Sequence, residues 1–158
     1  MRYLLPLFLV LAAMVVSCKD SDEKAVETLM TEIRAEYDNG NDKAVLAAID
    51  TLRQRYPKAI DARNECIAIY QNASLRMART ELAATDSLLE RAKAEYDAMK
   101  QATDAKHDAG TATAEEFTAT TKARIRRDSL QARFDVLCAE IKYIIKRQRQ
   151  EAERAPKE

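Results

Sequence analysis

Hydrophobic residues recur every three to four positions along most of the chain, which is the spacing of one face of an α-helix. Gly40, Pro57 and Gly110 interrupt this pattern. The uninterrupted stretches predict helices at about 22–37, 41–56, 58–105 and 113–153. We therefore expect an all-α protein, with a short N-terminal helical hairpin followed by a long antiparallel coiled-coil hairpin.

Residues at the predicted helix ends support this division. Gly40 supplies the left-handed residue that commonly closes a helix, and Asn41 or Asp42 is suited to cap the next one. Thr113 precedes Glu116 by three positions, the spacing of a capping box. These residues mark the turn of the short N-terminal hairpin and the turn of the long coiled-coil hairpin.

The two long helices carry heptads. The a and d positions are Leu82, Thr85, Leu89, Ala92, Tyr96 and Met99 in one helix and Leu130, Phe134, Leu137, Ile141 and Ile144 in the other. At 1.5 Å per residue each helix is roughly 65–70 Å long, and facing residues have numbers that sum to about 217. This register places Leu89 near Leu130, and Leu82 near Phe134 and Leu137. The alanine- and threonine-rich tip, 103–121, is expected to be the least stable end.

The N-terminal segment has a separate character. A single arginine precedes thirteen apolar residues, 4–16, a run too short for a bilayer core that needs about 20. Val15-Val16-Ser17-Cys18 follows the pattern of a lipobox, so the segment resembles a bacterial lipoprotein signal peptide. The resemblance implies that residues 1–17 are removed and that the Cys18 thiol carries lipid. The alternatives are an ordinary secretory signal with a chance cysteine, or an anchor that stays uncleaved.

The charged run at 19–23 follows the lipid site directly. It resembles the signal that sends lipoproteins of the Bacteroidetes to the outer face of the outer membrane. An alternative is a helix N-terminus, with Asp20 as N-cap and Glu23 three residues later. The predicted location is the bacterial cell envelope, most simply the outer membrane, on either its periplasmic or its surface face.

After removal of the signal peptide, 141 residues remain, which is room for one domain. The expected order is a lipid-anchored helical hairpin, 18–57, continuous with the coiled-coil hairpin, 58–158. A five-residue pattern in the first part resembles a tetratricopeptide repeat, through Gly40, Val45, Ile49, Leu52 and Pro57. No second copy follows, and a single helical hairpin explains the same spacing.

Two cysteines besides Cys18, namely Cys66 and Cys138, could form a disulfide in an oxidising compartment outside the cytoplasm. The predicted register places Cys138 opposite Arg79, roughly 20 Å along the helix from Cys66. A disulfide needs Cα atoms within about 7 Å. We expect Cys66 and Cys138 to be free, largely buried thiols.

Residues for catalysis or metal binding are sparse. His107 is the only histidine, at the predicted hairpin tip, which argues against a histidine-based triad and a zinc site with paired histidines. No glycine-rich phosphate loop occurs, and Glu115 and Glu116 are expected to be solvated. The sequence therefore predicts no catalytic residue, no cofactor and no metal, and hence no enzyme.

Charge also limits the partners. Basic and acidic residues number 26 each, so no net field favours nucleic acid. A basic cluster near the C-terminus has two interpretations, contact with a phosphate-bearing or acidic partner, or favourable charge at a helix end. Its members are Lys142, Lys146, Arg147, Arg149 and Arg154.

Three tripeptides fit Asp, Ser or Thr, then leucine, and resemble the O-glycosylation signal of exported Bacteroidetes proteins. Their hydroxyl residues are Thr51, Ser87 and Ser129. Chance alone gives on the order of one match in this composition, so the excess is mild. These residues are candidate O-glycosylation sites.

The predicted cellular location and the predicted helical fold together indicate a non-catalytic envelope lipoprotein that acts as an interaction or scaffold module. Its expected partners are the membrane, through lipid on Cys18, and proteins of the envelope. Phe117, Tyr143 and Ile145 lie off the predicted seam, which leaves homo-oligomerisation open. The alternative function is a holdase chaperone, because coiled-coil arms resemble those of some periplasmic chaperones.

Overall fold

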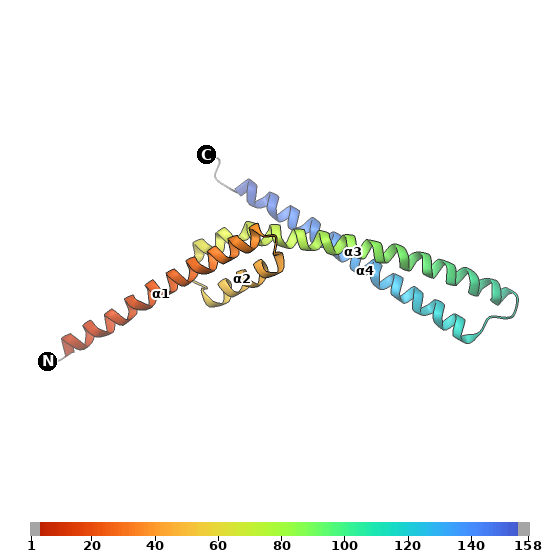
Figure 1. The fold of residues 1–158 in the computed structure, drawn as a ribbon, viewed down its shortest axis with the longest axis horizontal. Coiled ribbons are helices and arrows are strands. Elements are labelled where there is room, and N and C mark those ends of the chain that lie inside the picture. The colour runs from red at the N-terminus through yellow and green to blue at the C-terminus, as the bar shows by residue number, and fades with distance from the viewer. Residues whose placement is uncertain (1–3, 155–158) are drawn as a thin grey trace. The chain divides into compact units, whose positions relative to one another are not determined.

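The computed structural model describes the backbone of residues 4–154 and the side chains of residues 21–154. This part of the chain forms helices Leu4–Asp38 (α1), Asp42–Arg55 (α2), Ile60–Asp108 (α3) and Ala114–Arg154 (α4), and contains no strand (Figure 1). The predicted all-α fold with a helical hairpin is confirmed.

The helix bounds agree with the prediction within three residues, except at the start of α1. The predicted helix began near Asp22, whereas α1 begins at Leu4. Leucine and alanine in the apolar run are strong helix formers, and Pro6 lies in the first turn, where its missing N–H costs no hydrogen bond. Periodicity missed this extension because an apolar run has no polar face to mark its period.

The chain divides into two compact units inside α3, between Ser74 and Leu75. The first unit holds α1, α2 and the start of α3, and the second holds the rest of α3 and α4. The division predicted after residue 57 coincides with the turn between α2 and α3, seventeen residues before the boundary of the two units. Each unit is described by itself below.

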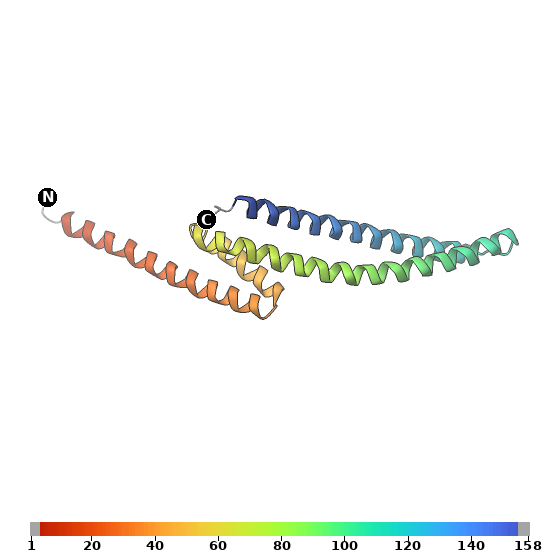
Figure 2. The same cartoon turned by 90° about the horizontal axis from the view of Figure 1, so that it is seen from above.

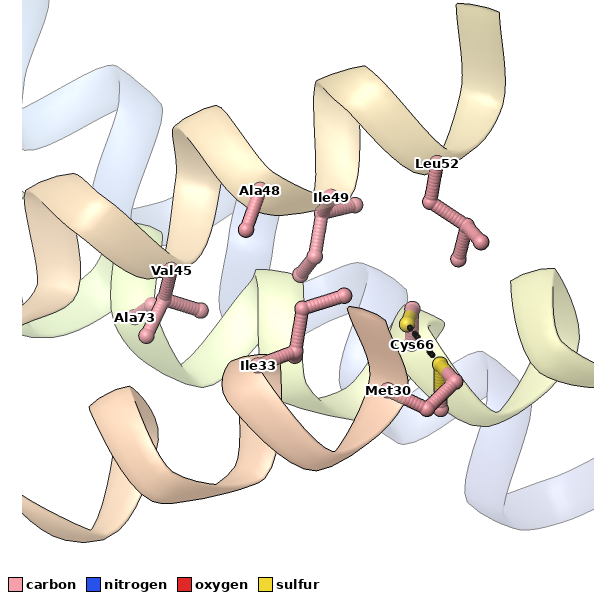
Figure 3. Packing of buried hydrophobic residues seen from close by; sticks show 8 residues of the cluster. All are labelled: Met30, Ile33, Val45, Ala48, Ile49, Leu52, Cys66 and Ala73. Carbon is pink, nitrogen blue, oxygen red and sulfur yellow. Dashed lines mark hydrogen bonds between the residues drawn. The ribbon is translucent and has the colours of Figure 1, made fainter. Parts of the chain in front are cut away.

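The first unit has a three-helix core (Figure 3). Its buried side chains are Met30 and Ile33 from α1, Val45, Ala48, Ile49 and Leu52 from α2, and Cys66 and Ala73 from α3. The four side chains Ile33, Val45, Ile49 and Leu52 are 0% exposed. Full burial of such a side chain contributes about 1.5–3 kcal/mol, so these few residues carry much of the unit's stability.

Polar contacts surround this core. Arg34 donates to Glu65 at 2.6 Å, and the Asn72 amide donates to the Tyr37 hydroxyl at 3.1 Å. Both contacts join α1 to the part of α3 that belongs to the first unit. The side chains of the ion pair are about half exposed, so its contribution is about 0–1 kcal/mol and the core remains the main stabilising element.

Gly40 closes α1 as predicted, with φ +75°. Its N–H donates to the Tyr37 carbonyl at 3.1 Å, and the Asn41 N–H donates to the Glu36 carbonyl at 2.9 Å, the paired bonds of a Schellman motif. Asn41 is the N-cap of α2 by position, but its side chain makes no cap bond. The Asn41 amide donates to the Glu36 carboxylate at 2.6 Å instead.

The second unit is a two-helix hairpin, in which α4 runs antiparallel to the part of α3 after Leu75 (Figure 2). Every predicted a and d residue of both helices is buried or half-buried. Leu89 and Leu137 are the most enclosed, each 1% exposed. The heptad pattern therefore identified the seam correctly.

The predicted register is wrong near the turn. It would have placed Thr103 opposite Ala114, whereas the Thr103 and Thr120 hydroxyls share a hydrogen bond at 2.8 Å, about six residues further along. The cause is that α3 continues to Asp108, which moves the centre of the turn. The offset continues farther along the hairpin, where the Arg126–Glu95 and Arg127–Tyr96 contacts join residues whose numbers sum to 221 and 223. Arg133 donates to Glu81 at 2.9 Å, a contact that two long side chains make.

Candidate functional site

The predicted lipid site, Cys18, lies outside the residues whose side chains are described. The backbone of α1 is helical through this position. Met30, the first core residue, follows twelve positions later, about 18 Å along the helix. No helix of the described chain is long and apolar enough to cross a membrane.

The candidate glycosylation residues all lie inside helices. Ser87 and Ser129 are exposed, whereas Thr51 is half-buried and precedes the fully buried Leu52. Each hydroxyl donates to the carbonyl four residues earlier, at 3.0 Å for Thr51, 3.1 Å for Ser87 and 2.8 Å for Ser129. Accessibility therefore favours the two serines as acceptors.

Cys66 and Cys138 are both free. Cys66 is buried in the first unit, where its thiol donates to the Met30 sulfur at 3.4 Å, whereas Cys138 is half-buried in α4. Burial raises the pKa of the Cys66 thiol above its usual value, and the neighbouring Glu65 raises it further. A protonated thiol among apolar side chains behaves as a small core residue.

The hairpin tip is a closely bonded polar cluster. Thr113 and Glu116 form the predicted capping box, because the Thr113 N–H donates to the Glu116 carboxylate at 2.9 Å and the Glu116 N–H donates to the Thr113 hydroxyl at 3.3 Å. Lys106 makes an ion pair with Glu116 across the turn. Hydrogen bonds from Lys106 and from the Thr113 backbone hold the pKa of the Glu116 carboxyl below its usual value.

Helix α3 ends at the tip as α1 ends at Gly40. Gly110 has φ +68°, its N–H donates to the His107 carbonyl at 2.9 Å, and the Thr111 N–H donates to the Lys106 carbonyl at 2.8 Å. The His107 ring makes an edge-to-face contact with Phe117, with ring centroids 5.7 Å apart. The sequence did not predict this ring contact, because the contact depends on the geometry of the folded turn.

Acidic and basic groups are otherwise arranged as a solvated surface. Among the described residues, no group of three or more histidine, cysteine or acidic side chains is placed to hold a metal ion. In the basic cluster, Arg147 is half-buried and donates to Glu151 at 3.2 Å, while Lys142, Lys146, Arg149 and Arg154 are exposed. A shallow, open depression lies beside the α1–α2 turn, lined mainly by small and polar residues from Gly40 to Ala47.

Cation–π contacts were not anticipated from the sequence. The Arg127 guanidinium lies 4.2 Å from the centre of the Tyr96 ring in the hairpin, and Arg53 lies 4.4 Å from the Tyr70 ring in the first unit. Arg127 occupies a heptad position of α4, so its stem covers seam surface while its charge meets the ring face. A charged residue at a heptad position interrupts the apolar pattern in the sequence, whereas in the structure the Arg127 side chain packs on Tyr96.

Comparison with protein-family models, with curated protein sequences and with solved structures finds no match to this chain.

Proposed function

We propose that this chain is a non-catalytic lipoprotein of the bacterial cell envelope, anchored by lipid on Cys18, that acts as an interaction module. The observation that carries the proposal is the tetrapeptide Val15-Val16-Ser17-Cys18 at the end of a short apolar run. Several acyl chains on one residue give stable anchoring, at about 0.8 kcal/mol per buried methylene.

The fold is compatible with this role in a specific way. Only about twelve residues separate Cys18 from the first core residue, and the backbone between them is helical. A lipid on Cys18 would therefore hold the first unit close to the membrane surface. The exposed faces of the helices supply the contact surface that an interaction module needs.

The lipid anchor is tested by expressing the full chain and its Cys18→Ser variant in a Gram-negative host with radiolabelled palmitate. We expect label and membrane fractionation for the natural sequence and neither for C18S. The matched control is Cys138→Ser, which alters a half-buried cysteine of α4 and should leave both unchanged. Membrane-bound but unlabelled C18S protein would instead indicate an uncleaved anchor.

The interaction role is tested by cross-linking a C-terminally tagged copy in living cells and identifying its neighbours by mass spectrometry. One partner at near-stoichiometric yield is the expected result. A broad set of unrelated envelope proteins, together with suppression of client aggregation, would replace the proposal with a holdase chaperone.

A further inference from the structure

Helix α4 carries a second uncharged face, opposite its seam with α3. It consists of Ala114, Thr118, Thr121, Ile125, Ser129, Ala132, Val136, Ala139 and Tyr143, which we call the outer stripe. Successive members are three or four residues apart and so lie on one side of the helix. Eleven of the thirty residues from Ala114 to Tyr143 are charged, and none of them lies on this stripe.

Every member of the outer stripe is exposed. Its three large side chains, Ile125, Val136 and Tyr143, are 57%, 55% and 63% exposed. The Thr118 and Ser129 hydroxyls donate to the carbonyls of Ala114 and Ile125, so their hydrogen-bonding capacity is partly used within the helix. A long uncharged stripe that carries exposed Ile, Val and Tyr side chains on an otherwise charged helix is typical of a helix–helix interface.

The stripe is complementary to itself when two copies run antiparallel. In one register, Ile125 of each copy faces Val136 of the other, and Tyr143 faces Thr118. The small residues Ser129 and Ala132 then meet at the two-fold axis, where they allow close approach of the helices. The contact from Thr118 to Tyr143 extends about 38 Å.

Charges beside the stripe favour the same register. Lys122 comes next to Glu140 of the second copy, and Glu115 comes next to Arg147. The two-fold axis makes each of these opposite-charge contacts twice. In a parallel pair opposite edges of the stripe would meet, so Lys122 and Glu140, which lie on the same edge, would not come together and this contact would be lost.

The other edge of the stripe is mixed. Asp135 lies near both Arg124 and Asp128 of the second copy. Asp128 is already bonded by Arg127 of its own chain at 2.6 Å, which weakens the repulsion between the two aspartates. The balance of both edges therefore still favours the antiparallel arrangement.

We propose that two copies of this chain associate antiparallel through the outer stripe of α4, with Ile125 opposite Val136 of the second copy. The interface is symmetric, so it closes as a dimer and leaves no open end for further growth. Ser129 lies at its centre, and a glycan on Ser129 would exclude this dimer.

Disulfide trapping tests the register in cells that express two differently tagged full-length copies, one carrying Ile125→Cys and the other Val136→Cys. Both copies also carry Cys138→Ala, which removes the half-buried native thiol of α4. After mild oxidation we expect a disulfide between the two tags, mapped to the 125 and 136 peptides. Either variant alone should cross-link weakly, because its two cysteines lie about 16 Å apart along the axis.

The matched controls are an exposed position on α3 and a charge swap. Asp97→Cys should give no cross-link. Lys122→Glu should lower the yield of the 125–136 disulfide several-fold, and the double change Lys122→Glu with Glu140→Lys should restore it. Retained helicity by circular dichroism separates these effects from unfolding.

Two results would overturn the proposal. Cross-linking of Ile125→Cys to itself, with a yield equal to that of the mixed pair, would indicate a parallel association. No mixed cross-link in cells that contain both folded copies would mean that the outer stripe does not join two copies.

Discussion

In the unit that ends at Ser74, three helices surround Ile33, Ile49 and Leu52, and each of these side chains is fully buried. In the hairpin that begins at Leu75, two helices meet along a single seam, and only Leu89 and Leu137 are enclosed to the same degree among the large residues. The same kinds of side chain are present in both units, so the number of helices decides the difference.

A third helix closes the space that two helices leave open. The hairpin lacks one, so fewer of its large side chains are fully enclosed. Ion pairs and cation–π contacts occur in both units, as with Arg34 and Glu65 in the first and Arg126 and Glu95 at 3.3 Å in the hairpin. The hairpin also leaves the outer stripe of α4 exposed. Packing therefore stabilises the first unit, and the hairpin keeps surface available for association.

The largest expected effect comes from truncating a core side chain in each unit. Leu52→Ala should cost about 3–5 kcal/mol and Leu137→Ala about 2–3 kcal/mol, because a two-helix seam relaxes around the lost volume more easily. Urea unfolding followed by far-ultraviolet circular dichroism measures both. A greater loss for Leu137→Ala would reverse the comparison.

The next effect concerns the turns. Gly110→Ala and Gly40→Ala should each cost about 1–2 kcal/mol, since both positions have left-handed φ and an added Cβ meets no atom within 4 Å. The loss is then backbone strain alone and should be equal in the two units. Asparagine at either position is the control, and it should lose less because it adopts left-handed φ more readily.

Capping at the hairpin tip has a smaller effect. Thr113→Ala removes the hydroxyl that accepts from the Glu116 N–H and should cost about 1 kcal/mol. Thermal unfolding of the variant measures the loss. Thr113→Ser keeps the hydroxyl and should retain most of the stability, and an equal loss for both variants would show that the cap bond is not what stabilises this turn.

Acid should weaken the same tip. The pKa of Glu116 is lowered in the folded chain, so its stabilising contribution is complete above the ordinary carboxyl pKa of about 4.5 and is lost as the pH falls below that value. Glu116→Gln should flatten this part of the dependence of stability on pH. An unchanged acid limb in Glu116→Gln would assign it to other carboxyl groups.

The smallest expected effects come from the exposed ion pairs. Arg34→Ala and Arg133→Ala should each cost no more than about 1 kcal/mol, and less at high salt, because their partners Glu65 and Glu81 are about half exposed. Unfolding at low and high ionic strength measures this. A large loss that salt leaves unchanged would mean that packing of the arginine stem dominates.

Local chemistry predicted much of this fold. Gly40, Gly110 and the Thr113–Glu116 capping box act within a few residues of themselves, and the heptads mark a seam by periodicity alone. The contribution of Cys66 and Ala73 to a three-helix core could not be predicted in this way, because it depends on contacts between distant segments. The register near the turn failed since a shift of a few residues in the end of α3 moves every pair beside it.

The candidate sites also divide into those that local sequence predicts and those that need the folded chain. Ser87 lies outside the predicted a and d positions, and it is exposed. The contact of His107 with Phe117 needs the folded turn and was missed. Lipid on Cys18 stays a prediction from the lipobox.

Hydrogen exchange along α3 tests the central comparison most directly, because one continuous helix passes from the three-helix unit into the two-helix hairpin. We expect the amides of residues 66–74 to exchange much more slowly than those of residues 95–104, with the change in protection close to Ser74. Equal protection along the whole helix, or greater protection in 95–104, would contradict the account of one packed unit and one less enclosed hairpin.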